Sequence, residues 1–275
     1  MSRSRAAEDG TRVRDEILDI PPEDIIERAA DVGGERLDRG AADILVTGVI
    51  GGIEVSLGGL AAATVLGALL RIPGMEPESA LTVAGLVFPI GFLFVVMGRS
   101  ELFTENFLIP VVGVLAGRRP WRELPQLWGL SWVGNLAGCA GVAALLSVPR
   151  AVGPSIVDGY ASYAHAKLEP PPVAVFVSAV LAGMTMTVLT WLVIALRHPV
   201  AKIVAIWAAG YVLFAANLSH AIVGAAMVFT GFAHAHEHWT AVLRWLVLST
   251  AGNLVGGVTL VTVFRLIQAR ERERG

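Results

Sequence analysis

Charged residues are scarce in this sequence, and their scarcity argues against an ordinary soluble domain. Only 16% of the 275 residues are charged, whereas 55% are hydrophobic and 30 are glycine. A soluble domain of this size needs more polar residues to cover its surface. We therefore expect the lipid bilayer to be the solvent for most of the chain.

The sequence also has only one cysteine and no excess of positively charged residues over negatively charged ones. Cys139 is the only cysteine, so the chain cannot form an intrachain disulfide. The net charge of −2 argues against a nucleic-acid partner. The sequence contains none of the common patterns of zinc proteases, serine hydrolases or P-loop proteins. We therefore expect neither an enzyme nor a bound metal or cofactor.

Six runs of sequence are long enough to cross a bilayer, which takes about 20 mainly apolar residues. They lie near 42–70, 80–116, 125–148, 173–196, 200–231 and 240–267. We predict an all-α membrane protein of six spans. The spanning domain covers residues 41–268, between a cytoplasmic segment (1–40) and a cytoplasmic tail (269–275).

The orientation follows from the short loops, because Lys and Arg concentrate on the cytoplasmic side. Most of these residues follow the second, fourth and sixth runs: Arg118, Arg119, Arg122, Arg197, Lys202, Arg265, Arg270, Arg272 and Arg274. Both termini are then cytoplasmic, in a multi-pass protein of the inner, or cytoplasmic, membrane.

The first 40 residues are polar and lack the charged-then-apolar pattern of a signal peptide, so we expect the first run to remain as a span. Residues 21–30 begin with two prolines, continue with an acidic turn and place apolar residues on one side. We predict a short amphipathic helix there, at the inner membrane surface.

Two of the runs, 80–116 and 200–231, are too long for one helix. The first contains a polar stretch at 98–106, and the second a milder one at 216–220. Backbone without helical hydrogen bonds is tolerated at membrane depth only where protein or water surrounds it. We therefore predict that the second and fifth spans are broken in mid-membrane, which is typical of channels and transporters for small solutes.

A short motif recurs in the two halves of the chain. Gly134–Gly138 reads G-N-L-A-G and Gly252–Gly256 reads G-N-L-V-G. Three spans per half is an odd number, so the two halves would be inverted repeats. The small residues allow helices to approach closely, and the amides of Asn135 and Asn253 could bond across the contact. Helix packing alone would also explain the motif.

Ionisable residues inside apolar runs are candidates for function. Burial favours neutral His220 and an approaching anion favours its charged form, so it could exchange a proton with a weak acid. Glu54 could face a pore or bond a neighbouring helix. Glu101 and Glu105 lie in the first polar stretch, where backbone amides could satisfy them. We expect the loop histidines to be solvated: His234, His236 and His238.

These residues resemble those of the formate/nitrite transporter family. The resemblance rests on Glu101–Asn106 (E-L-F-T-E-N), the two G-N-L-x-G motifs, His220 and the segment Pro21–Ala29. Members are homopentamers of six-span protomers with an aquaporin-like fold. Each protomer has one pore for small monovalent anions such as formate, nitrite or hydrosulfide. The resemblance implies the same fold, assembly and substrate class for this chain, in contact with membrane lipid.

The resemblance also implies roles for single residues. Leu102 and Phe103 would form an apolar constriction, with Leu213 as a second gate residue. Thr104 would contact the substrate, and His220 would be the central pore histidine. Three polar residues within the spans complete the candidate pathway: Glu54, Asn135 and Asn253. Lys167 resembles a lysine of the family that draws anions towards the pore. A lysine in a loop is, however, more often simply solvated.

The chain departs from the family around the histidine. Members usually have Glu before it and Asn four residues after it, where this chain has Ser219 and Gly224. Gly183 stands where the family has an Asn that bonds the histidine, if Trp191 marks the register. Because its partners set the tautomer of a histidine, specificity for formate or nitrite does not follow from the resemblance.

In an anion pathway, the free energy cost of removing water from an ion is high in a low-dielectric pore. A weak acid would therefore pass in its neutral form, after protonation near His220.

Two other functions stay open. A neutral-solute pore would instead use His220 only as a lining residue. An intramembrane enzyme would need Ser219 and His220 to act together, but neighbours on a helix point about 100° apart.

Overall fold

The computed structural model describes residues 22–232, 234 and 238–274, and these residues form helices and turns without a strand. The predicted all-α class is confirmed. Four helices are long and apolar enough to cross a bilayer: α3 (Ala41–Leu69), α7 (Glu123–Leu146), α9 (Pro172–Ala195) and the continuous helix Trp239–Gln268. The last comprises α12 (Trp239–Leu254), a π-helical stretch η2 (Val255–Thr262) and the beginning of α13 (Val263–Arg274). These helices match the first, third, fourth and sixth apolar runs.

The second run is divided into short helices. They are α4 (Pro77–Ala84), α5 (Ile90–Gly98), the 3-10 helix η1 (Phe103–Phe107) and α6 (Ile109–Leu115). Helix α5 ends where Arg99 adopts a left-handed conformation with φ 60°. The sequence did not predict the turn between α4 and α5, which ends at Pro89, a residue that cannot donate a backbone hydrogen bond.

The fifth run forms two helices, α10 (Pro199–Ala215) and α11 (Ala221–Phe232). Between them Asn217 is left-handed, with φ 49°, a conformation that Asn tolerates better than most residues. Helix α11 is buried along almost its whole length, because it packs against α3, α7, α8 and α12.

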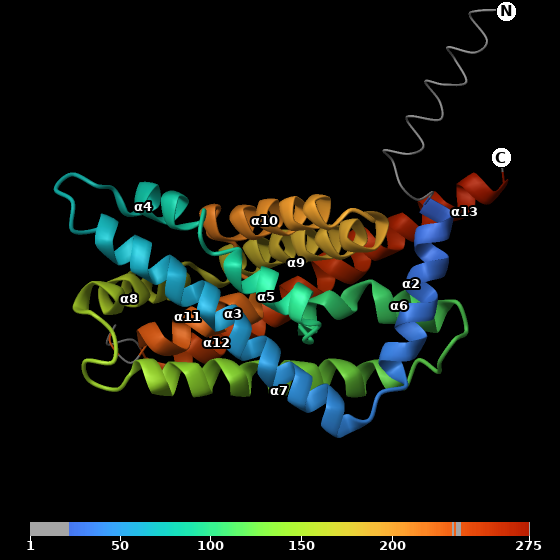
Figure 1. Ribbon diagram of the computed structural model, residues 1–275, viewed down its shortest axis with the longest axis horizontal. Helices are drawn as coiled ribbons and strands as arrows, with labels where there is room; N and C mark the ends of the chain where they lie inside the picture. The colour runs from blue at the N-terminus through green and yellow to red at the C-terminus, as the bar shows by residue number, and fades with distance from the viewer. Residues whose placement is uncertain (1–21, 233, 235–237, 275) are drawn as a thin grey trace, which may run out of the picture.

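Two further helices close the ends of the bundle. Helix α2 (Pro22–Leu37) has acidic residues in its first turn and Arg36 in its last, as the helix dipole favours. It lies across one end, beside α6 and α13 (Figure 1). Helix α8 (Pro154–Leu168) lies at the other end (Figure 1). This stretch was predicted to be a loop, but it is helical, and one side of it buries Tyr160, Tyr163 and Leu168.

The G-N-L-x-G motifs lie where long helices meet. A side-chain carbon on Gly52 of α3 would lie 2.1 Å from the backbone oxygen of Asn135 in α7. The same carbon on Gly183 of α9 would lie 2.1 Å from the backbone oxygen of Asn253 in α12. The two helix pairs therefore make the same close contact, and only glycine fits at either position.

Candidate functional site

Two asparagines hold the polar stretches of the two halves in the same way. Asn135 donates to Glu101 O at 2.8 Å and accepts from Phe103 N at 2.9 Å. Its amide also donates to Gly48 O of α3. Each asparagine is fully buried. Because one side chain replaces hydrogen bonds that a continuous helix would make, it stabilises non-helical backbone in the core.

The second asparagine repeats this pattern. Asn253 donates to Ser219 O at 3.0 Å and accepts from Ala221 N at 2.8 Å. Its amide also donates to Ala179 O of α9. Asn253 therefore fixes the residues on either side of His220.

His220 and Thr104 bring the two polar stretches together. The imidazole Nε2 lies 2.9 Å from Thr104 Oγ1, and neither residue is exposed to solvent. The backbone N–H of Val223 donates to Nδ1 at 3.1 Å, so Nδ1 carries no proton. The neutral imidazole then carries its proton on Nε2 and donates it to Thr104 Oγ1. The threonine hydroxyl keeps its own proton for donation to another group.

Apolar side chains surround this pair. Leu102, Phe103 and Leu213 are all buried and belong to one core cluster. The ring of Phe92 meets the His220 imidazole edge-on, with 6.4 Å between the ring centres. The imidazole and the hydroxyl are therefore polar groups within an apolar region of low dielectric.

Lys167 is a helical, buried residue rather than a solvated loop lysine. It is 1% exposed, and its Nζ donates to Asn217 O at 2.7 Å and to Leu218 O at 2.8 Å. Burial lowers the pKa of Lys167 well below its ordinary value. The second polar stretch (216–220) contains no Lys or Arg, but α8 brings the amine of Lys167 to it.

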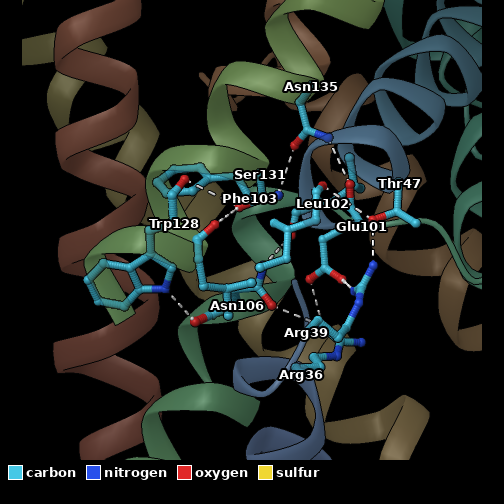
Figure 2. A network of polar contacts seen from close by, with 12 residues as sticks. Arg36, Arg39, Thr47, Glu101, Leu102, Phe103, Asn106, Trp128, Ser131 and Asn135 are labelled. Carbon is cyan, nitrogen blue, oxygen red and sulfur yellow. Dashed lines mark hydrogen bonds and ion pairs between the residues drawn. The ribbon is translucent and has the colours of Figure 1, made fainter. Parts of the chain in front are cut away.

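The first polar stretch is held by two arginines of the N-terminal region. Figure 2 shows Arg36 and Arg39 converging on Glu101. Arg39 donates to Glu101 Oε2 at 2.6 Å and to Thr47 Oγ1 at 2.6 Å. Arg36 donates to Glu101 Oε1 at 3.3 Å and to Asn106 Oδ1 at 3.0 Å. The predicted satisfaction of Glu101 by backbone amides is wrong, because these side chains satisfy it.

A cleft of about 480 Å³ opens beside this ion-pair cluster. Both signs of charge line it: Arg36, Arg39, Arg99, Glu35, Glu101 and Glu105. Helices α2, α5 and α9 form its walls together with the polar stretch after α5. The cleft therefore gives access from the α2 end of the bundle towards the segment that carries Thr104.

Glu54 lies apart from these groups. Its carboxylate accepts a hydrogen bond from Ser100 Oγ, and it lines an apolar surface groove with Leu57 and Phe94. Of the loop histidines, His236 lies outside the described residues, whereas His234 lines a cleft near α8. Within the described part of the chain, no three metal-ligating side chains gather.

The structure shows what surrounds the three residues that depart from the family pattern, Gly183, Ser219 and Gly224. Gly183 cannot be larger, because it contacts the backbone of Asn253. A side-chain carbon on Gly224 would lie 2.2 Å from Cζ2 of Trp245, so the indole fills that space. The backbone N–H of Ser219 donates to Ser178 Oγ at 3.0 Å.

Three neighbours of the polar stretches were not predicted from the sequence: Arg36, Arg39 and Trp245. The two arginines lie beyond the predicted amphipathic helix (21–30), and their closeness in the sequence was the one available signal. Trp245 lies in an ordinary apolar run, and nothing in the sequence distinguishes it from a packing residue.

The comparisons with known proteins agree with this architecture. A solved FNT family ion channel covers 89% of this chain and 98% of its own, with a TM-score of 0.78 and 25% identity. A second solved structure, a pentameric formate channel with formate bound, has a TM-score of 0.69 at 18% identity and covers 82% of this chain and 96% of its own. The nitrite transporter NirC of Salmonella typhimurium is 30% identical over 232 residues, which cover 78% of this chain and 79% of that protein. A model of the formate/nitrite transporter family matches residues 23–267, and the chain therefore belongs to the formate/nitrite transporter family.

Proposed function

We propose that this protein is a membrane channel or transporter for small monovalent weak-acid anions of the formate, nitrite and hydrosulfide class. The observation that carries the proposal is the buried His220–Thr104 pair, at which two interrupted helices meet. Burying an imidazole and a hydroxyl among apolar side chains is costly, and a pathway in which a solute needs hydrogen-bonding partners accounts for that cost. The names of the nitrite transporter and the formate channel above support the substrate class.

In the proposed mechanism, the substrate passes the apolar residues as a neutral acid. An anion enters from either end, past the cleft that Arg36 and Arg39 line or past α8, where an approaching negative charge favours the protonated form of the Lys167 amine. The Thr104 hydroxyl donates a hydrogen bond to it, and near His220 the anion takes up a proton that comes from the aqueous phase. Leu102, Phe103 and Leu213 then admit the neutral acid far more easily than a dehydrated ion.

The membrane arrangement is part of the proposal. The interrupted helices α5–η1–α6 and α10–α11 complete six spans, and the two halves are inverted repeats of aquaporin-like build. The matching contacts of Asn135 and Asn253 support the repeat. Both termini face the cytoplasm across the inner membrane, and five protomers assemble, as in the pentameric formate channel.

Uptake into proteoliposomes tests the function. Native protein, His220→Ala and His220→Gln are compared for formate, nitrite, hydrosulfide and glycerol, between about pH 5 and pH 8, where an imidazole ordinarily titrates. We expect native protein to take up the weak acids faster than empty vesicles do. Uptake should rise as the outside pH falls, because more protons are available for the anion. Either substitution should lower uptake by at least about tenfold.

A different result would change the function. If only glycerol or water crosses, or if His220 is dispensable, the protein is a neutral-solute pore in which the imidazole only lines the path. Rapid chloride flux without pH dependence would contradict the protonation step.

A further inference from the structure

Two hydrogen-bond donors of α12, near the segment that carries His220, have no partner in the part of the chain that the structure describes. The indole N–H of Trp245 and the hydroxyl of Ser249 are both fully buried. Among the described residues, neither atom has a hydrogen-bond acceptor or donor. A buried polar group without a partner is costly and rare, so each of them calls for an explanation.

These donors share one face of α12. Trp245 and Ser249 are one helical turn apart, and Asn253 follows after one more turn. Asn253 bonds the residues on both sides of His220. The face that carries the two donors is therefore the face that holds the second polar stretch in place.

The indole of Trp245 lies against α11, one turn beyond His220. A side-chain carbon on Gly224 would lie 2.2 Å from Cζ2 and 2.3 Å from Cη2 of Trp245. Gly224 N donates to His220 O at 2.8 Å, which places Gly224 on the first turn after the histidine. The space that an amide side chain at position 224 would use is therefore occupied by an aromatic ring with one donor.

The first half of the chain has a serine at the position equivalent to Ser249, and the hydroxyl of that serine has a hydrogen-bond partner. When the two G-N-L-x-G motifs are aligned, Ser131 matches Ser249 and Asn106 matches Gly224. The hydroxyl of Ser131 donates to Leu127 O in its own helix at 2.7 Å. Ser249 has the same type of acceptor available in α12 but does not bond it. Of the two matched serines, only Ser249 therefore leaves its hydroxyl without a partner among the described residues.

Further unpartnered groups follow along α11 towards α8. The hydroxyls of Tyr160 and Thr230 are also buried without a hydrogen-bond partner in the described part of the chain. Tyr160 lies near the end of α11, since a side-chain carbon on Gly231 would lie 2.2 Å from Tyr160 O. Several buried donors without a partner among the described residues thus lie on α11 and on α8 and α12, which pack against it.

We propose that Trp245 and Ser249 form a second substrate-contacting pair, on the α8 side of His220, which donates hydrogen bonds to the oxygen atoms of a small oxyanion. This inference rests on the proposed transport function and narrows its substrate class. Indole and hydroxyl donors suit carboxylate and nitrite oxygens, whereas sulfur is a weak acceptor. A site built to donate hydrogen bonds discriminates strongly against a solute that cannot accept them.

The test compares three variants in proteoliposomes: Ser249→Ala, Trp245→Phe and the matched control Ser131→Ala. The concentration dependence of formate uptake and of hydrosulfide uptake is measured on the same vesicles. The ratio of the two rates is independent of the amount of folded protein. We expect Ser249→Ala and Trp245→Phe to raise the half-saturating formate concentration by about tenfold. Hydrosulfide uptake should change less than about twofold, and Ser131→Ala should change neither.

The outcomes separate this inference from the function on which it rests. If native protein carries both solutes and the variants keep the native formate constant, or lose both solutes equally, Trp245 and Ser249 are packing residues and the inference is wrong. If native protein moves neither solute faster than empty vesicles do, the transport function itself fails.

Discussion

For a single residue such as His220, the hydrogen bonds decide what the side chain can do. Its Nδ1 accepts from a backbone N–H and its Nε2 faces Thr104. The ring is therefore fixed in one tautomer, with its proton directed at a hydroxyl. Thr104 links the ring to any substrate that accepts the hydroxyl proton. This relay makes the threonine as important as the histidine.

Replacing Thr104 by valine tests the relay at constant volume. Thr104→Val removes the donor to the substrate and leaves the buried Nε2–H without its acceptor. We expect formate uptake to fall by about tenfold or more. Thr104→Ser, which keeps the hydroxyl, should stay within a few-fold of native uptake. Thr185→Val is the control, because the Thr185 hydroxyl bonds Leu181 O of its own helix. Native uptake by the valine variant would exclude a substrate contact at Thr104.

At the scale of elements, ion pairs attach the N-terminal region to the interrupted second run. Glu101 has a side chain only 4% exposed, and both of its partners come from outside that run, Arg36 from α2 and Arg39 from the turn after it. Hydrogen bonding to Asp43, together with the nearby Glu101, raises the pKa of Arg39, so the charge on this partner is permanent. Removing one partner of a buried pair is costly because the remaining charge stays desolvated.

Substitution of Arg39 tests this attachment. We expect Arg39→Gln to destabilise the protein by roughly 1–3 kcal/mol, less than for an isolated buried pair because Arg36 remains. The double variant Arg39→Gln with Glu101→Gln should recover part of the loss, because the buried Glu101 carboxylate is removed, while the partly exposed Arg36 keeps its hydrogen bond to Asn106. The measurement is thermal unfolding in detergent. Arg71→Gln serves as the control: its pair with Asp158 is 55% and 58% exposed, so its loss should cost at most about 1 kcal/mol. Equal losses for Arg39→Gln and Arg71→Gln would argue against a structural role for the cluster.

The whole molecule has α2 and α13 at one end and α8 at the other (Figure 1). This separation turns the predicted orientation into a labelling experiment. The native Cys139 is fully buried, so it should not react with a membrane-impermeant maleimide. In spheroplasts with a sealed inner membrane, the variant Gly153→Cys should be labelled from outside, because residue 153 lies at the exposed start of α8. Ser2→Cys and Gly275→Cys should react only after the membrane is opened. Labelling of a terminal cysteine in sealed cells would reverse the proposed orientation.

The sequence predicted the class of the fold and much of the candidate site. Four of its apolar runs are single long helices, because hydrophobic length is a local property that a sequence displays directly. Its polar stretches at 98–106 and 216–220 mark where helices α5 and α10 end. The helix over 154–168 was missed, because its burial depends on α3 and α11, which are distant in the sequence.

The amino-acid sequence alone defines which groups are available: a bilayer-length apolar pattern, one histidine deep in it, and paired asparagines among small residues. Which of these groups meet depends on how the helices pack in three dimensions. This packing brings Thr104 to His220, Lys167 to the carbonyls before His220, and Arg39 to Glu101. The physical reason is that each contact joins segments that are distant in the sequence, and its geometry is set by how closely the helices next to those segments pack. Glycines such as Gly52 and Gly183 permit that approach, but their partners become visible only once the helices are in place.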